Sequence, residues 1–130
     1  MRKITEDAVE AFMEGRRFKR DNTEVRPSFN GWWVMFLFGS IIAARHKDSK
    51  DLYIRTAGYL TRTTKERLNG LPGVHIQQRR REWYMNGTNI NELWQTPPQD
   101  MPLGYYRYIP VLSAETRNRT KMHWIYEVAV

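Results

Sequence analysis

The sequence predicts a single α+β domain in which an N-terminal helix packs on a mostly antiparallel, aromatic-rich sheet. Three observations lead to this prediction. Apolar residues recur at helical spacing in residues 5–14, and short apolar runs separated by turn residues follow in 23–55. A capped helical segment then leads into a further hairpin at 63–87. A chain of 130 residues is the usual size of one domain.

The N-terminal helix is expected to be capped by the hydroxyl of Thr5, to run through Glu14 and to end at Gly15. Acidic residues in its first turn suit the positive end of the helix dipole. The apolar side chains of this segment share one face, which we expect to pack on the sheet: Ala8, Val9, Phe12 and Met13.

The first part of the sheet is expected to be an antiparallel meander with short connections. A strand at 23–26 is followed by Asn30 and Gly31, a strong hairpin signal. The next run, residues 32–38, is apolar on both faces and therefore predicts a central strand. The N-terminal helix would cover one face, and the C-terminal segment or a second copy of the chain would cover the other. Strands at 41–46 and 52–55 complete the meander.

A short second helix is expected at about residues 64–69, inserted between strands. Thr63 and Glu66 fit a capping box, and Gly70 supplies a left-handed residue at the C-terminal end. Strands at 74–78 and 83–85 then pair as a hairpin. Beyond residue 87, a proline-rich excursion at 88–104 precedes a C-terminal β-hairpin that joins 105–112 to 121–128.

The residue inventory argues against several kinds of chemistry. The chain has no Cys, which excludes disulfides, thiol nucleophiles and thiolate metal sites. His46, His75 and His123 lie on separate predicted strands without the spacing of metal ligands. No phosphate-binding glycine motif is present, and no apolar run is long enough to span a membrane. We therefore expect a non-enzymatic protein without metal, cofactor, signal peptide or membrane segment.

The net charge of +7 favours an anionic partner, and the cations are clustered. Arg79, Arg80 and Arg81 at a hairpin tip offer planar groups for phosphate, and the adjacent Trp83 and Tyr84 offer rings on which bases stack. This arrangement predicts a nucleic-acid or nucleotide contact. The alternative is a solvated hairpin tip with the indole ring in the core.

Two further basic groups are candidates for the same contact. One surrounds Phe18 and consists of Arg16, Arg17, Lys19 and Arg20; the other is Lys65 with Arg67 on the second helix. The first group has an alternative explanation, since cations near a helix C-terminus complement its dipole while Phe18 enters the core.

Four sequence blocks resemble a family of small, largely uncharacterised bacteriophage proteins. The blocks are ITEDAVEAF, FKRDNTEV, AGYLTRTTKERLNGLPGV and WYMNG, and the family shares an NTTKERLNGLPGV-like core followed by WYLNG. The resemblance covers about residues 3–87, and the chain departs from the family in its Trp-rich 32–38 strand and in the segment from about residue 88. It implies a viral origin, action in the cytoplasm of an infected bacterium, and a binding role; it supplies no catalytic residues.

Two functional hypotheses follow. In the first, the protein binds nucleic acid or a nucleotide through its clustered cations. In the second, it inhibits a host protein or joins a viral assembly through exposed aromatic side chains, including Trp32, Trp33, Trp94 and residues 105–108. A homodimer through the apolar 32–38 strand is compatible with both hypotheses.

Overall fold

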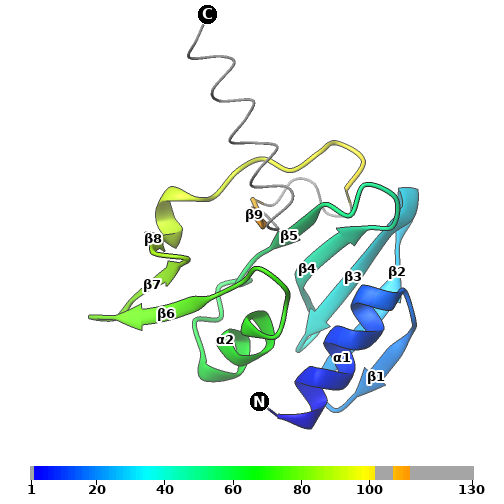
Figure 1. The fold of residues 1–130 in the computed structure, drawn as a ribbon, viewed down its shortest axis with the longest axis horizontal. Coiled ribbons are helices and arrows are strands. Elements are labelled where there is room, and N and C mark those ends of the chain that lie inside the picture. The colour runs from blue at the N-terminus through cyan, green and yellow to red at the C-terminus, as the bar shows by residue number, and fades with distance from the viewer. Residues whose placement is uncertain (1, 102–106, 112–130) are drawn as a thin grey trace, which may run out of the picture.

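The computed structural model describes residues 2–101 and 107–111, and it confirms the α+β fold. Figure 1 shows helix α1 (Lys3–Glu14) against a large sheet, with α2 (Arg62–Asn69) between that sheet and a smaller one. Neither helix in this part of the chain has the length and apolar character that crossing a membrane requires. The predicted strand at 121–128 lies outside the described residues.

The larger sheet is antiparallel throughout. Its second to fifth strands form the predicted meander, whereas its first strand, at residues 18–20, was not predicted. A 3-10 turn, η1 (Phe29–Gly31), joins the second and third strands with Asn30 at φ 57° and Gly31 at φ 84°. In spatial order the strands are β1 (Phe18–Arg20), β2 (Thr23–Pro27), β3 (Trp32–Leu37), β4 (Ser40–His46), β5 (Leu52–Ile54) and β9 (Ile109–Val111).

The smaller sheet contains the predicted hairpin. It is formed by β6 (Ile76–Arg79), β7 (Glu82–Met85) and β8 (Thr88–Asn89), and the 3-10 turn η2 (Ile90–Glu92) follows it. Asn69 at the end of α2 fixes the base of this hairpin, because its side chain accepts from the Ile76 amide at 2.6 Å and donates to the Ile76 carbonyl at 3.1 Å.

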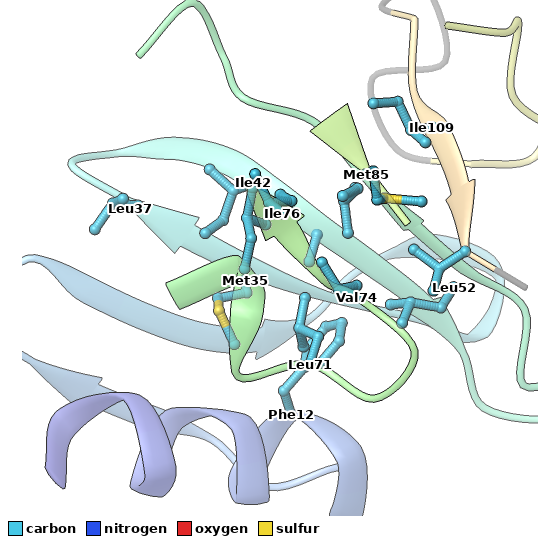
Figure 2. Close-up of a cluster of buried hydrophobic side chains, with 14 of the residues drawn as sticks. Phe12, Met35, Leu37, Ile42, Leu52, Leu71, Val74, Ile76, Met85 and Ile109 are labelled. Carbon is cyan, nitrogen blue, oxygen red and sulfur yellow. The ribbon is translucent and has the colours of Figure 1, made fainter. Parts of the chain in front are cut away.

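The main core lies between α1, the larger sheet and the segment that follows α2. Figure 2 shows Phe12 of α1 approaching Leu71 and Val74, with Met35 of β3 and Met85 of β7 in the same cluster. The burial of these side chains joins the two sheets through one hydrophobic cluster. The smaller sheet is therefore attached to the rest of the protein by packing as well as by the chain.

The second face of the larger sheet is covered by the same chain. Met101 and Tyr108 pack there against Trp32, Val34 and neighbouring residues, and Tyr108 forms a bridge to Gln95. The prediction that β3 is apolar on both faces is therefore confirmed. Because the second face is covered, exposed apolar surface on this strand no longer argues for a homodimer.

The predicted start of α1 is wrong. The helix begins at Lys3, and Arg2 occupies the N-cap position without a side-chain cap. Thr5 lies inside the first turn, fully buried, and its hydroxyl donates to Glu66 of α2 at 2.6 Å. Gly15 ends the helix at φ 75°, as predicted. On the apolar face, Ala8, Ala11 and Phe12 are buried, whereas Met13 is exposed.

The predicted caps of α2 are also wrong. The N-cap is Thr61, whose hydroxyl accepts from the Thr64 amide at 3.2 Å. Gly70 has φ −74°, so it is not left-handed. A glycine is needed there for a different reason: an added Cβ would lie 2.6 Å from Cγ2 of Thr5 and 3.0 Å from Cγ2 of Val9. The close approach of α1 and α2 thus depends on Gly70.

Candidate functional site

The tip of the β6–β7 hairpin has an unusual backbone. Arg80 and Arg81 form a two-residue turn between the paired residues Arg79 and Glu82, with φ angles of 51° and 70°. Turns of this type favour Asn-Gly, because the left-handed conformation costs other residues roughly 1–2 kcal/mol each. The fold itself therefore disfavours two arginines at this position.

The tip arginines, defined as Arg79, Arg80 and Arg81, are all exposed. Within the described residues, Arg80 and Arg81 have no hydrogen-bond or ion-pair partner. The guanidinium of Arg79 lies over the ring of Tyr84, with 4.6 Å from its Cζ atom to the ring centroid. The tip thus presents three positive groups, one of which is held against an aromatic ring.

A hollow of about 460 Å³ lies beside these groups, lined by Arg79, Arg80, Glu82 and Tyr84. Its one carboxylate, Glu82, accepts from the side-chain amide of Asn89 at 3.1 Å and from the Tyr84 hydroxyl at 3.4 Å. These contacts hold Glu82 close to the sheet. The hollow therefore combines cations, a half-buried ring and a hydrogen-bonded carboxylate.

Two residues that were predicted to contact a partner are buried instead. Trp83 is only 2% exposed and packs in the main core, so it cannot stack on a base. Arg67 is completely buried, so its predicted anion contact is wrong. Trp94 is half-buried and packs against the core cluster. Of the predicted rings near the tip, only Tyr84 faces the hollow.

Arg67 joins three elements through hydrogen bonds. Its Nε donates to Thr23 of β2 at 3.1 Å, and its Nη1 donates to Thr5 of α1 at 2.7 Å and to the neighbouring Glu66. Its Nη2 donates to Asn22 at 3.4 Å. Burial lowers the pKa of the Arg67 guanidinium, and Glu66 acts in the opposite direction. This arginine has a structural role.

The basic group around Phe18 is partly neutralised. Arg16 pairs with Glu14 at 2.7 Å and with Glu10 at 3.7 Å, and Arg20 pairs with Asp7 at 2.8 Å. Phe18 is half-buried against the core, with the Arg20 guanidinium 5.0 Å from its ring centroid.

Arg17 and Lys19 in this group remain exposed, and Lys65 is half-buried on α2. In Figure 1 the β6–β7 hairpin lies at the left margin, whereas α1 and β1 lie at the lower right with α2 between. The basic groups therefore do not converge on one site, and the tip arginines are the group with the fewest protein partners.

Phe38 is an exposed aromatic residue that was predicted to end a buried strand. It instead occupies the β3–β4 turn at φ 51°, is 59% exposed, and borders a hollow of about 490 Å³. Its position before Gly39 is the only sequence signal for this placement.

The aromatic residues predicted to anchor a protein partner are not exposed where the structure describes them. Trp32 and Tyr108 are buried, and Trp33 packs against the core. Residues 105 and 106 lie outside the described part of the chain.

Metal chemistry has no evident site in residues 2–101 and 107–111. No group of three or more His, Asp or Glu side chains is arranged there to hold an ion. His46 is engaged with the backbone, since its Nε2 lies 2.8 Å from the Asn30 carbonyl oxygen. His75, directly before β6, is exposed, and its Nε2 lies 3.1 Å from Nε2 of Gln77.

Comparison with known proteins identifies a family. A family model described as Kyanoviridae Gp96 protein matches residues 1–102, which extends beyond the four blocks that carry the resemblance. No curated protein and no solved structure matches the chain. The match covers most of the sequence and confirms the resemblance to a small phage protein family. The chain therefore belongs to the Kyanoviridae Gp96 protein family, a family of phage proteins.

Proposed function

We propose that this phage protein is a non-enzymatic binding protein that acts in the host bacterial cytoplasm and binds nucleic acid through the tip arginines. The observation that carries the proposal is the left-handed backbone at Arg80 and Arg81. Unfavourable backbone conformations concentrate at functional positions, because the surrounding structure must hold them. Asn-Gly would suit this turn better, yet the chain has two arginines there.

The chemistry of the tip supports an anionic partner. Each guanidinium presents several donors in one plane, a geometry that matches two phosphate oxygens. Arg80 and Arg81 are exposed and have no protein partner in the described residues, so binding would not require a protein ion pair to break. The net charge of +7 would add long-range attraction to the same partner.

The test is the double variant Arg80→Asn/Arg81→Gly, which removes two charges and installs the preferred turn sequence. Binding to a labelled oligonucleotide is followed by fluorescence anisotropy across a salt series. We expect weaker binding. The slope of the logarithm of the binding constant against the logarithm of the salt concentration should fall in magnitude by about 1.4 to 1.8, the value for two lost phosphate contacts.

The matched control is Arg17→Gln/Lys19→Gln, which removes the same charge from the side of α1 and β1. This control is expected to retain most of the affinity. Equal losses in the two double variants would show that only net charge matters. Salt-independent binding, or no binding by the unaltered protein, would refute the proposal.

Phe38 supports a second candidate function, which is inhibition of a host protein or participation in a viral assembly. A bulky residue at φ 51° is an outlier, and its ring is exposed beside a hollow. Phe38→Asn would install Asn-Gly at this turn and should preserve folding. A stoichiometric protein captured from nuclease-treated host lysate, and lost with Phe38→Asn, would favour this candidate. Capture that is unchanged by the substitution would exclude Phe38 as the anchor.

A further inference from the structure

We infer that the outer face of the β6–β7–β8 sheet binds the bases of single-stranded nucleic acid, with the stacked side chains of Arg79 and Tyr84 as the platform. This inference rests on the proposed function, since it assigns bases to a surface beside the phosphate-binding tip. It also narrows the partner, because duplex and single strands present different chemical groups to a protein.

The two faces of this sheet have different characters. Ile76, Trp83 and Met85 are buried in the main core. Side chains alternate along a strand, so Gln77 and Tyr84 occupy the opposite face. Gln77 is exposed and Tyr84 is half-buried. The outer face is therefore polar and open, with one aromatic ring on it.

Strand register places three planar side chains in one row across this face. Gln77 is paired with Tyr84, and Tyr84 is paired with Asn89. Paired residues on adjacent strands project on the same side of a sheet and lie close together. The row thus consists of an aromatic ring flanked by two amides. The Asn89 amide is held in place, since it donates to Glu82 at 3.1 Å and accepts from the Asn91 amide at 2.9 Å. The exposed Gln77 amide offers both a donor and an acceptor, as the Watson–Crick edge of a base requires.

The neighbouring pair, Arg79 and Glu82, extends the same face toward the tip. The Arg79 guanidinium lies over the Tyr84 ring, 4.6 Å from its centroid, so the two are stacked and the guanidinium covers one face of the ring. A base would stack on the exposed guanidinium or displace it from the ring. Bases stack on arginine planes as well as on aromatic rings. The Glu82 carboxylate opposes phosphate binding, but its position beside the ring suits an exocyclic amino group of a base.

This arrangement favours single strands for a steric reason. In a duplex the base faces are covered by stacking and their pairing edges are occupied, so a ring on an open sheet cannot reach them. A duplex would contact only the tip arginines. A single strand would contact the same arginines through phosphate and also place a base on the Arg79–Tyr84 surface.

The experiment measures binding of single-stranded and duplex oligonucleotides of one sequence at fixed salt. For the unaltered protein we expect a preference for the single strand on the order of tenfold, the effect of one stacked base. Tyr84→Leu should remove that preference, with a larger loss of affinity for the single strand than for the duplex. Tyr84→Phe, which keeps the ring and loses only the long contact to Glu82, should retain the preference.

The outcomes separate this inference from the proposed function. Equal or tighter binding of the duplex by the unaltered protein, or a single-strand preference that survives Tyr84→Leu, overturns the inference. If Tyr84→Leu does not fold, the exposed Gln77→Ala serves instead, with an expected several-fold loss for the single strand alone; an equal loss for both forms overturns the inference. If Arg80→Asn/Arg81→Gly binds both forms as tightly as the unaltered protein does, the proposed function itself is overturned.

Discussion

Arg67 and the tip arginines have the same side chain but opposite surroundings. The Arg67 guanidinium is completely buried and donates to four side chains from α1, α2, β2 and the preceding turn. Arg80 and Arg81 are exposed and have no partner within the described residues. Burying a charge without partners is prohibitively costly, so the network around Arg67 is a condition of the fold. Folding does not require any such network at the tip arginines.

The comparison shows that a run of cations in a sequence can combine unrelated roles. Arg45 is a second buried example, since it donates to the Phe12 carbonyl at 2.9 Å and 3.2 Å near the end of α1. Such arginines cannot be counted toward an electropositive surface. What remains for a partner is the set that the fold leaves unsatisfied.

The largest expected effect on stability is that of Arg67→Met. The substitution leaves Glu66, Thr5 and Thr23 without their shared donor inside the protein. Breaking a buried charge pair typically costs about 3–5 kcal/mol. Chemical denaturation of Arg67→Met and of the exposed control Arg62→Met measures the difference in unfolding free energy. Similar, small losses in the two variants would contradict the structural role of Arg67.

Gly70→Ala tests the packing that brings Arg67 to its partners. The added methyl group would meet Thr5 Cγ2 at 2.6 Å, and overpacking of this kind costs about 1–3 kcal/mol. Adding Thr5→Ser removes the closest methyl group and keeps the hydroxyl that contacts Arg67. A double-mutant cycle should therefore show partial rescue, whereas strictly additive losses would argue against the contact.

The caps of α2 provide a smaller and sharper contrast. Thr61→Ala removes the hydroxyl that accepts from the Thr64 amide, and it should cost about 1 kcal/mol. Thr63→Ala, at the position where the sequence predicted a cap, should change the unfolding free energy by less than about 0.5 kcal/mol. The reverse order in thermal unfolding would restore the predicted capping box.

Asp7→Asn should have the smallest effect, because its ion pairs are exposed. Hydrogen bonds from Arg20 and then from Lys3 lower the pKa of Asp7. This contribution to stability is present above the ordinary carboxyl pKa and is lost as pH falls through the lowered, folded-state value. Denaturation at neutral pH should show a slight loss for Asp7→Asn that disappears in acid. A difference independent of pH would contradict this explanation.

Local patterns were enough to predict much of the fold. Short apolar runs bounded by turn residues predicted the meander, and period-two alternation predicted the β6–β7 hairpin, because both signals are properties of each segment by itself. Gly15 was predicted to end α1 because a left-handed residue is needed there whatever surrounds it. The apolar character of β3 on both faces also predicted its central position.

The features that the sequence could not predict depend on distant partners. Thr5 and Thr63 were predicted as caps, but Thr5 contacts Glu66, 61 positions away, and Thr61 caps α2. The burial of Arg67 likewise depends on Thr5 and Thr23, at separations of 62 and 44 positions. A charged residue on a short polar helix has no local signal of such burial. The left-handed backbone of Arg80 and Arg81 is also invisible without the register of β6 and β7.

The central claim is that the tip arginines serve a partner and not the fold, and one variant tests both halves. Arg80→Asn/Arg81→Gly should raise the unfolding free energy by about 1–3 kcal/mol, since it relieves two unfavourable backbone conformations. The same protein should lose affinity for the oligonucleotide. A variant that is less stable than the unaltered protein, or equally stable with unchanged affinity, would contradict the claim.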